Sequence, residues 1–170
     1  MKRIGLIVAY DGTNYCGWQV QPNGITIQGE LNRCLSELLG EEIETIGASR
    51  TDAGVHAMGN VAVFDTNTRI PGEKISYALN QRLPEDIRIQ LSEEMPLDFH
   101  PRYCDSVKTY EYRILNRRFP VPTERLYSYF YHYKLDVEGS HFLSDRASRF
   151  CEFLWLRSAG KEYSADDSLH

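Results

Sequence analysis

The sequence predicts an α+β fold, and two observations support that prediction. Apolar runs suited to strands alternate with segments whose apolar residues recur at helical spacing. Over the first hundred residues the order is strand, helix, strand, strand, helix, strand. That order is typical of the ferredoxin-like split βαβ plan, in which helices cover one face of an antiparallel sheet. The 170 residues suffice for one domain with a sizeable core and part of a second.

The elements of this first domain follow one another with clear boundaries. Residues 3–10 predict a buried strand, and residues 11–24, rich in Gly, Asn and Pro, predict a loop. Apolar residues at helical spacing predict a helix over 26–39, with Thr26 as its N-cap and Gly40 as its C-terminal stop. The remaining predicted elements are strands at 43–48, 60–66 and 86–92 and a helix at 73–82.

A second unit is expected to begin near residue 104. Two strands, 107–115 and 127–135, flank a turn-rich segment, and seven of the eleven tyrosines lie between residues 103 and 133. Such a strand pair is either a stacking platform for bases or a sheet face packed on a core. Helical spacing over 143–156 precedes a small, polar tail. The expected domains are therefore 1–103, α+β and carrying the candidate chemistry described below, then 104–139, the start of a second and incomplete α+β domain, and 140–170, an atypical tail.

Charge and cysteine usage narrow the class of protein. The net charge is −5, and residues 1–100 hold 8 basic and 14 acidic side chains, whereas residues 101–139 hold 7 and 5. A local basic groove is therefore compatible with an acidic chain.

The four cysteines form no CxxC pair and no metal-ligand spacing, which favours a reducing cytoplasm. No apolar run reaches the roughly 20 residues of a membrane span, and the N-terminus is expected to be a strand rather than a signal peptide.

The segment 47–57, GASRTDAGVHA, holds the candidate chemistry. Arg50 and Asp52 are two residues apart, so both point to one side if the segment is extended. A guanidinium within about 4–6 Å would keep Asp52 ionised, as a base or nucleophile requires. The alternative is an ion pair that only stabilises the loop. His56 is either a third participant or a packed loop histidine.

Other chemistries find less support in the sequence. It holds no Gly-rich phosphate loop, no serine nucleophile elbow and no Cys-His signature. Asp11 and Asp52 could form a glycosidase-like pair of carboxylates, although sequence alone does not give their separation.

Four motifs in order resemble the tRNA pseudouridine synthase A family. The segment 47–57 resembles its active-site segment, and YDGTNYCGWQ at 10–19 resembles its first loop. LNQRLPEDI at 79–87 resembles a helix-end motif. FHPRY at 99–103 with KTYEYR at 108–113 resembles the start of the second domain. The resemblance covers residues 4 to about 138.

The resemblance implies an isomerase without cofactor or metal that converts uridine to pseudouridine in the anticodon stem-loop of tRNA, at tRNA positions 38–40. It implies Asp52 as the nucleophile, Arg50 as its ion-pair partner and Tyr110 against the target base, with Tyr112 as the alternative if the register of that motif is shifted. It also implies a cytoplasmic homodimer that binds RNA and has no membrane partner.

The expected family pattern stops at about residue 139. The chain has no Gly-x-His-Asp-Phe followed by Ser-Phe, and it lacks the later basic residue that completes the family's site. A truncation or a frameshift would account for this. The alternative function is therefore that of a shortened, non-catalytic relative that retains RNA or dimer contacts.

Overall fold

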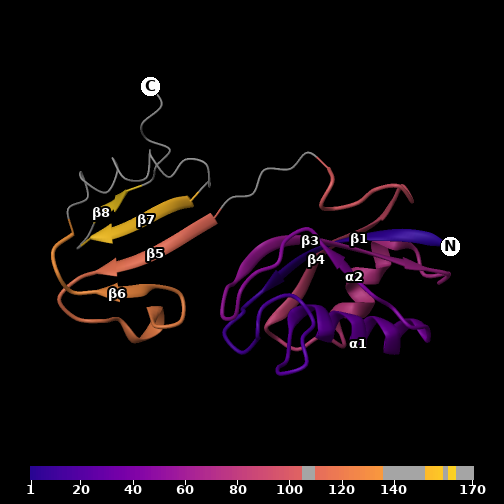
Figure 1. Ribbon diagram of the computed structural model, residues 1–170, viewed down its shortest axis with the longest axis horizontal. Helices are drawn as coiled ribbons and strands as arrows, with labels where there is room; N and C mark the ends of the chain where they lie inside the picture. The colour runs from indigo at the N-terminus through magenta and orange to yellow at the C-terminus, as the bar shows by residue number, and fades with distance from the viewer. Residues whose placement is uncertain (105–109, 136–151, 159–160, 164–170) are drawn as a thin grey trace. The chain divides into compact units, whose positions relative to one another are not determined.

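The computed structural model describes residues 1–104, 110–135, 152–158 and 161–163 (Figure 1). The chain divides into two compact units, Met1–Asp105 and Ser106–His170. Each unit is described by itself. Among the described residues, no helix is long and apolar enough to cross a membrane.

The first unit confirms the predicted split βαβ order. Its elements are β1 (Lys2–Tyr10), α1 (Ile27–Leu39), β2 (Ile46–Gly47), β3 (Ala57–Thr66), α2 (Gly72–Asn80) and β4 (Ile87–Met95). The sheet has the strand order β2-β3-β1-β4, and every neighbouring pair is antiparallel (Figure 1). The central strand β1 is therefore paired on both sides.

Both helices cover the same face of this sheet. Alternate residues of β1 point to that face and are buried with apolar side chains from α1 and α2 in one cluster. The core members with the least exposure from these elements are Ile4, Leu6, Val8, Ile27, Leu31, Cys34, Leu35, Ile75 and Leu79. Burying a side chain of this size contributes about 1.5–3 kcal/mol, so this face holds the unit together.

The ends of α1 follow the predicted capping. The Thr26 side chain accepts a hydrogen bond from the backbone N–H of Gly29. Gly40 adopts φ +69°, a left-handed conformation, and its N–H donates to the carbonyl of Ser36.

The strand predicted over 43–48 is shorter than expected, since β2 contains only Ile46 and Gly47. Side chains of α1 satisfy the backbone just before it. The N–H of Ile43 donates to Ser36 Oγ, and that of Thr45 donates to Asn32 Oδ1. A backbone group bonded to a helix side chain does not take part in a sheet ladder, so the strand begins only after Thr45.

The segment after β4 folds back on the first unit. Arg3 and Asp65 are cross-strand partners on the sheet face opposite the helices, where Arg3 donates to both carboxylate oxygens at 2.7 and 2.8 Å. A third donor, Arg3 Nη1, bonds the carbonyl oxygen of Phe99 at 2.7 Å. Residues 96–104, which we call the strap, therefore lie against this opposite face.

The second unit is a separate sheet with the strand order β6-β5-β7-β8. Its elements are β5 (Tyr110–Asn116), the 3-10 turn η1 (Pro122–Glu124), β6 (Tyr129–Tyr131), β7 (Glu152–Ser158) and β8 (Lys161–Tyr163). The strand β5 is parallel to β6 and to β7, and β7 is antiparallel to β8. The predicted strand over 127–135 is reduced to three residues.

The helix predicted over 143–156 is wrong where the structure describes it. Residues 143–151 lie outside the described residues, and residues 152–156 belong to β7. This strand pairs with β5 over seven residues. The sequence EFLWLRS is rich in aromatic and branched residues that suit a strand, so pairing with β5 outweighs apolar spacing that also fitted a helix.

Candidate active site

The loop of residues 48–56, between β2 and β3, contains Arg50 and Asp52. We call it the catalytic loop. Its first residues are anchored to β3: the N–H of Ala48 donates to the carbonyl of Val61 at 2.7 Å. The buried side chain of Asn60 accepts from Ser49 N at 3.3 Å and donates to Ser49 O at 3.1 Å. The backbone that enters the loop is thus fixed by both ladder and side-chain bonds.

The segment of residues 11–19, the first loop, holds the middle of the catalytic loop. The N–H of Trp18 donates to the carbonyl of Thr51 at 3.0 Å, and the N–H of Gly54 donates to the carbonyl of Tyr15 at 3.2 Å. Gly17 has φ +83°, and a Cβ on it would lie 2.5 Å from the Thr51 oxygen. The loops therefore touch backbone to backbone on both sides of Asp52, a contact that needs glycine at position 17.

Two buried aromatic residues, Tyr10 and Trp18, support the contact between the first loop and the catalytic loop. The rings of Tyr10 and Trp18 lie 5.9 Å apart, and the Tyr10 hydroxyl lies 2.8 Å from Thr51 Oγ1. Burial raises the pKa of Tyr10, although hydrogen bonds from Thr51 and Asn60 oppose that effect. The phenol therefore stays neutral and acts as a hydrogen-bonding support for the loop.

Asp52 and Arg50 are both exposed. Within the described part of the chain, no ion pair of 4.0 Å or less joins the two side chains. The Asp52 carbonyl accepts a hydrogen bond from Val55 N at 3.2 Å, which closes a turn through the backbone alone. The carboxylate of Asp52 is thus not used to stabilise the loop by an ion pair with Arg50.

His56 lies between the catalytic loop and the first loop. Its Nδ1 accepts a hydrogen bond from Gly12 N at 3.1 Å and lies 3.0 Å from Asp11 Oδ1. The same Asp11 oxygen accepts from the N–H and the hydroxyl of Thr13, at 3.0 and 2.6 Å. These contacts favour the packed-histidine alternative for His56, and they give Asp11 a role in ordering the first loop.

Tyr110 and Tyr112 lie on β5 in the second unit, with exposed fractions of 51% and 53%. They are two residues apart and share one face of the strand. Parallel pairing places Tyr129 beside Ile114, on that same face, and Tyr129 is also exposed. The face therefore offers aromatic surface to a ligand, although Tyr110 and Tyr112 are equivalent in exposure.

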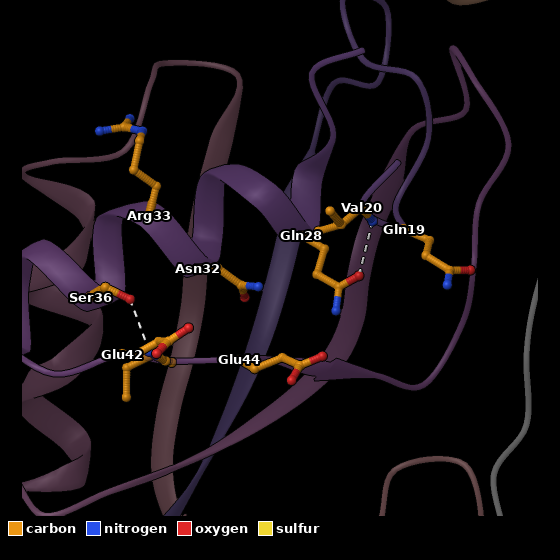
Figure 2. Close-up of a pocket in the computed structure, with 9 residues that line it drawn as sticks. Gln19, Val20, Gln28, Asn32, Arg33, Ser36, Glu42 and Glu44 are labelled. Carbon is orange, nitrogen blue, oxygen red and sulfur yellow. Dashed lines mark hydrogen bonds between the residues drawn. The ribbon is translucent and has the colours of Figure 1, made fainter. Parts of the chain in front are cut away.

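A polar groove of about 510 Å³ lies beside α1, away from the predicted site residues (Figure 2). Gln28 accepts from Val20 N and donates to the carbonyl of Thr45. Glu42 and Glu44 also line the groove. The amide side chains of Gln28 and Asn32 are engaged in holding neighbouring backbone, and the carboxylates of the groove would repel phosphate.

Among the described residues, no group of three or more His, Cys, Asp or Glu side chains could hold a metal ion. Cys16, Cys34 and Cys104 are free thiols. Sequence reasoning did not identify Tyr10 and Asn60 as supports of the catalytic loop. Both residues lie in strands, and only the side-chain hydrogen bonds of the folded chain show that they reach Thr51 and Ser49.

Comparison of the sequence with known proteins shows which family the chain resembles. The sequence profile of a family described as tRNA pseudouridine synthase matches residues 6–104. Proteins named tRNA pseudouridine synthase A are similar over longer stretches. The one from Acetivibrio thermocellus is 47% identical over 165 residues, which are 94% of this chain and 66% of that protein.

Two further relatives bear the same name. The protein of Caldicellulosiruptor bescii is 44% identical over 168 residues, 99% of this chain and 66% of its own length. That of Thermoanaerobacter sp. strain X514 is 49% identical over 138 residues, 81% of this chain and 57% of its own length. The chain thus spans between 57% and 66% of these three curated relatives.

Proposed function

The chain belongs to the tRNA pseudouridine synthase family, and from this membership we propose that it isomerises uridine to pseudouridine in the anticodon stem-loop of tRNA. The observation that supports the proposal most is the state of Asp52. Its carboxylate is exposed and forms no ion pair with Arg50, on a loop whose backbone is held before and after it. A nucleophile needs this combination of a free side chain and a fixed position.

The reaction is an isomerisation, so no external reactant is consumed. The bond between ribose and uracil N1 breaks, the base turns, and a bond forms between ribose and uracil C5. The C5 proton is released, and N1 ends protonated. If the Asp52 carboxylate attacks the ribose, it is displaced as uracil C5 bonds to the same carbon; if it attacks the base, it is eliminated after the carbon–carbon bond has formed.

Arg50 and the tyrosines of β5 have complementary roles in this proposal. An exposed guanidinium beside Asp52 fills the space that the target nucleotide leaves when it turns out of the helix, and it comes within ion-pair distance of Asp52 once RNA is bound. Tyr110 stacks on the extruded uracil, which offsets part of the few kcal/mol lost on unstacking. Tyr112 takes that role if the register of the motif is shifted by two.

The second candidate function is a non-catalytic relative that retains RNA or dimer contacts. As a catalyst, the protein would act as a cytoplasmic homodimer without a metal or cofactor.

Pseudouridine mapping tests the proposal. The chain is joined to the part of the A. thermocellus relative that it does not match, and this extended chain is incubated with a tRNA transcript. We expect pseudouridine in the anticodon stem-loop, and none there in a transcript whose uridines at those positions are cytidines. We expect the 170-residue chain alone to be slower by about 10²-fold or more, because it matches at most 66% of the three relatives described above and small misplacements of reacting groups cost that much in rate.

Each outcome of the mapping discriminates between the candidates. Modification only outside the anticodon stem-loop contradicts the proposed site. Binding of tRNA by the extended chain without any pseudouridine favours the non-catalytic relative. Fast turnover by the 170-residue chain alone shows that its own C-terminal residues complete the site.

A further inference from the structure

Arg102 lies on the strap, in the FHPRY motif, and the proposed chemistry gives it no role. Its Nε donates a hydrogen bond to the carbonyl oxygen of Gly47 at 2.9 Å. Gly47 ends β2, and the catalytic loop begins with the next residue. The guanidinium of Arg102 therefore lies at the base of the loop that presents Asp52.

The strap fixes the backbone from which this side chain extends. Arg3 bonds the carbonyl of Phe99, and the N–H of Arg102 donates to His100 Nδ1 at 3.2 Å. The rings of His100 and Tyr103 stack with their centroids 4.3 Å apart. Arg102 thus starts from an ordered segment, and its Nε bond sets the plane of the guanidinium.

The Nε bond leaves the Nη1 and Nη2 donors of Arg102 available. Among the described residues neither has a hydrogen-bond acceptor, and the side chain is exposed. A guanidinium presents its donors in a planar fork that fits two oxygens of a phosphate. The entropy cost of orienting the group is reduced because its plane is already set.

Among the described residues, no carboxylate pairs with the charge of Arg102. Within the first unit Lys2, Arg3 and Arg33 pair with carboxylates. Arg102 has no carboxylate within 4.0 Å among the described residues, and exposed Arg50 lies three residues beyond the Gly47 carbonyl that Arg102 binds. Two cations that have no carboxylate partner in the described part of the chain therefore lie at the start of the catalytic loop, in a unit that is acidic as a whole.

Support of the loop alone does not explain this arginine. The same stretch of backbone is already held by the ladder bond of Ala48 and by both bonds from Asn60 to Ser49. A bond from Arg102 to Gly47 adds to them, but it does not require a full charge with two further donors that no described residue engages.

We propose that Arg102 binds a backbone phosphate of the RNA substrate next to the nucleotide that Asp52 attacks, with the Gly47 carbonyl holding the guanidinium in place. This inference rests on the proposed function for the identity of the ligand. Its test measures RNA binding and does not depend on the isomerisation.

Affinity of the 170-residue chain for unmodified tRNA is measured as a function of salt. We expect Arg102→Gln to raise Kd about 10-fold at about 50 mM salt and to reduce the slope of log K against log salt by about one. Arg102→Lys keeps the charge but loses the fork, so we expect a smaller rise in Kd and an unchanged slope.

Arg69→Gln is the matched control. Arg69 is exposed and lies three residues beyond the end of β3, whereas the Gly47 that Arg102 binds pairs with Ala62, four residues or about 13 Å before that end. The Arg69→Gln substitution removes the same charge as Arg102→Gln does, and we expect it to change Kd by less than about 2-fold. Equal melting temperatures of the variants exclude a folding effect.

Several results would overturn the inference. These are an unchanged Kd and slope in Arg102→Gln, an equal loss in Arg69→Gln, or no tRNA binding by the wild-type chain. A slower reaction of the extended chain at saturating tRNA, without a change in Kd, would instead make Arg102 a support of the loop. If the Arg102 effect is found but mapping detects no pseudouridine, the proposed function fails and the phosphate contact stands.

Discussion

Gly17 is the residue at which the first loop meets the backbone of the catalytic loop. It combines φ +83° with a position where a Cβ would lie 2.5 Å from the Thr51 oxygen. Gly40 has a similar φ of +69° but nothing within 4 Å of its Cβ position. The two glycines therefore separate the cost of the left-handed conformation from the cost of close contact.

We expect Gly17→Ala to lower the free energy of unfolding by about 3 kcal/mol and Gly40→Ala by about 1 kcal/mol. The difference arises because only position 17 must also move backbone away from the new methyl group. Urea denaturation followed by circular dichroism measures both. Equal losses would contradict the tight contact between the loops.

At this scale the sequence identified the candidate residues but not their neighbours. Arg50, Asp52 and His56 were recognisable because they fall in one short loop between two strands. The partners of His56 are Asp11 and Gly12, more than forty residues away, and they meet only through the pairing of β1 with β3. The expected ion pair between Arg50 and Asp52 does not follow from their spacing, since the described structure has none.

At the scale of elements, the pair of Arg3 and Asp65 joins β1, β3 and the strap. The hydrogen bond from Arg3 lowers the pKa of Asp65, and burial of the carboxyl group opposes this effect. A carboxylate whose folded pKa lies below its unfolded value contributes stability above the unfolded pKa, near about 3.9, and that stability is lost as the pH falls through the folded pKa.

We expect Asp65→Asn to reduce the free energy of unfolding at pH 7 by less than about 1 kcal/mol, since the carboxyl group is about a third exposed and water screens the pair. The difference from wild type should shrink as the pH falls from about 5 to below about 3.9. Glu93→Gln, an exposed residue of β4, is the control and should show no such trend. A difference that stays constant with pH would contradict a role for the Asp65 charge.

The elements themselves were predictable where local signals and packing agree. The cap of α1 and the alternation of β1 are of this kind. The short β2 was not, because side chains of α1 bond the backbone ahead of it. Nor was β7, because its pairing with β5 joins residues about forty positions apart, which apolar spacing within one segment does not reveal.

At the scale of the whole molecule, an acidic chain is expected to act on RNA. The net charge is −5, yet Arg50 and Arg102 lie at the start of the catalytic loop, and no carboxylate of the described residues pairs with either. The positive charges at the start of that loop and its fixed backbone therefore matter more for RNA binding than the net charge of the chain does. The fold class was accessible from the order of elements, whereas this distribution of free cations required the structure.

The central claim is that Asp52 is the nucleophile, and replacing its carboxylate tests this most directly. Tritium release from tRNA labelled at C5 of uridine is measured for the extended chain and for its Asp52→Asn variant. An amide keeps the shape of the side chain but cannot attack as a carboxylate does. The account predicts no release above background by the variant, with its melting temperature and tRNA affinity unchanged. Release at the wild-type rate would contradict it.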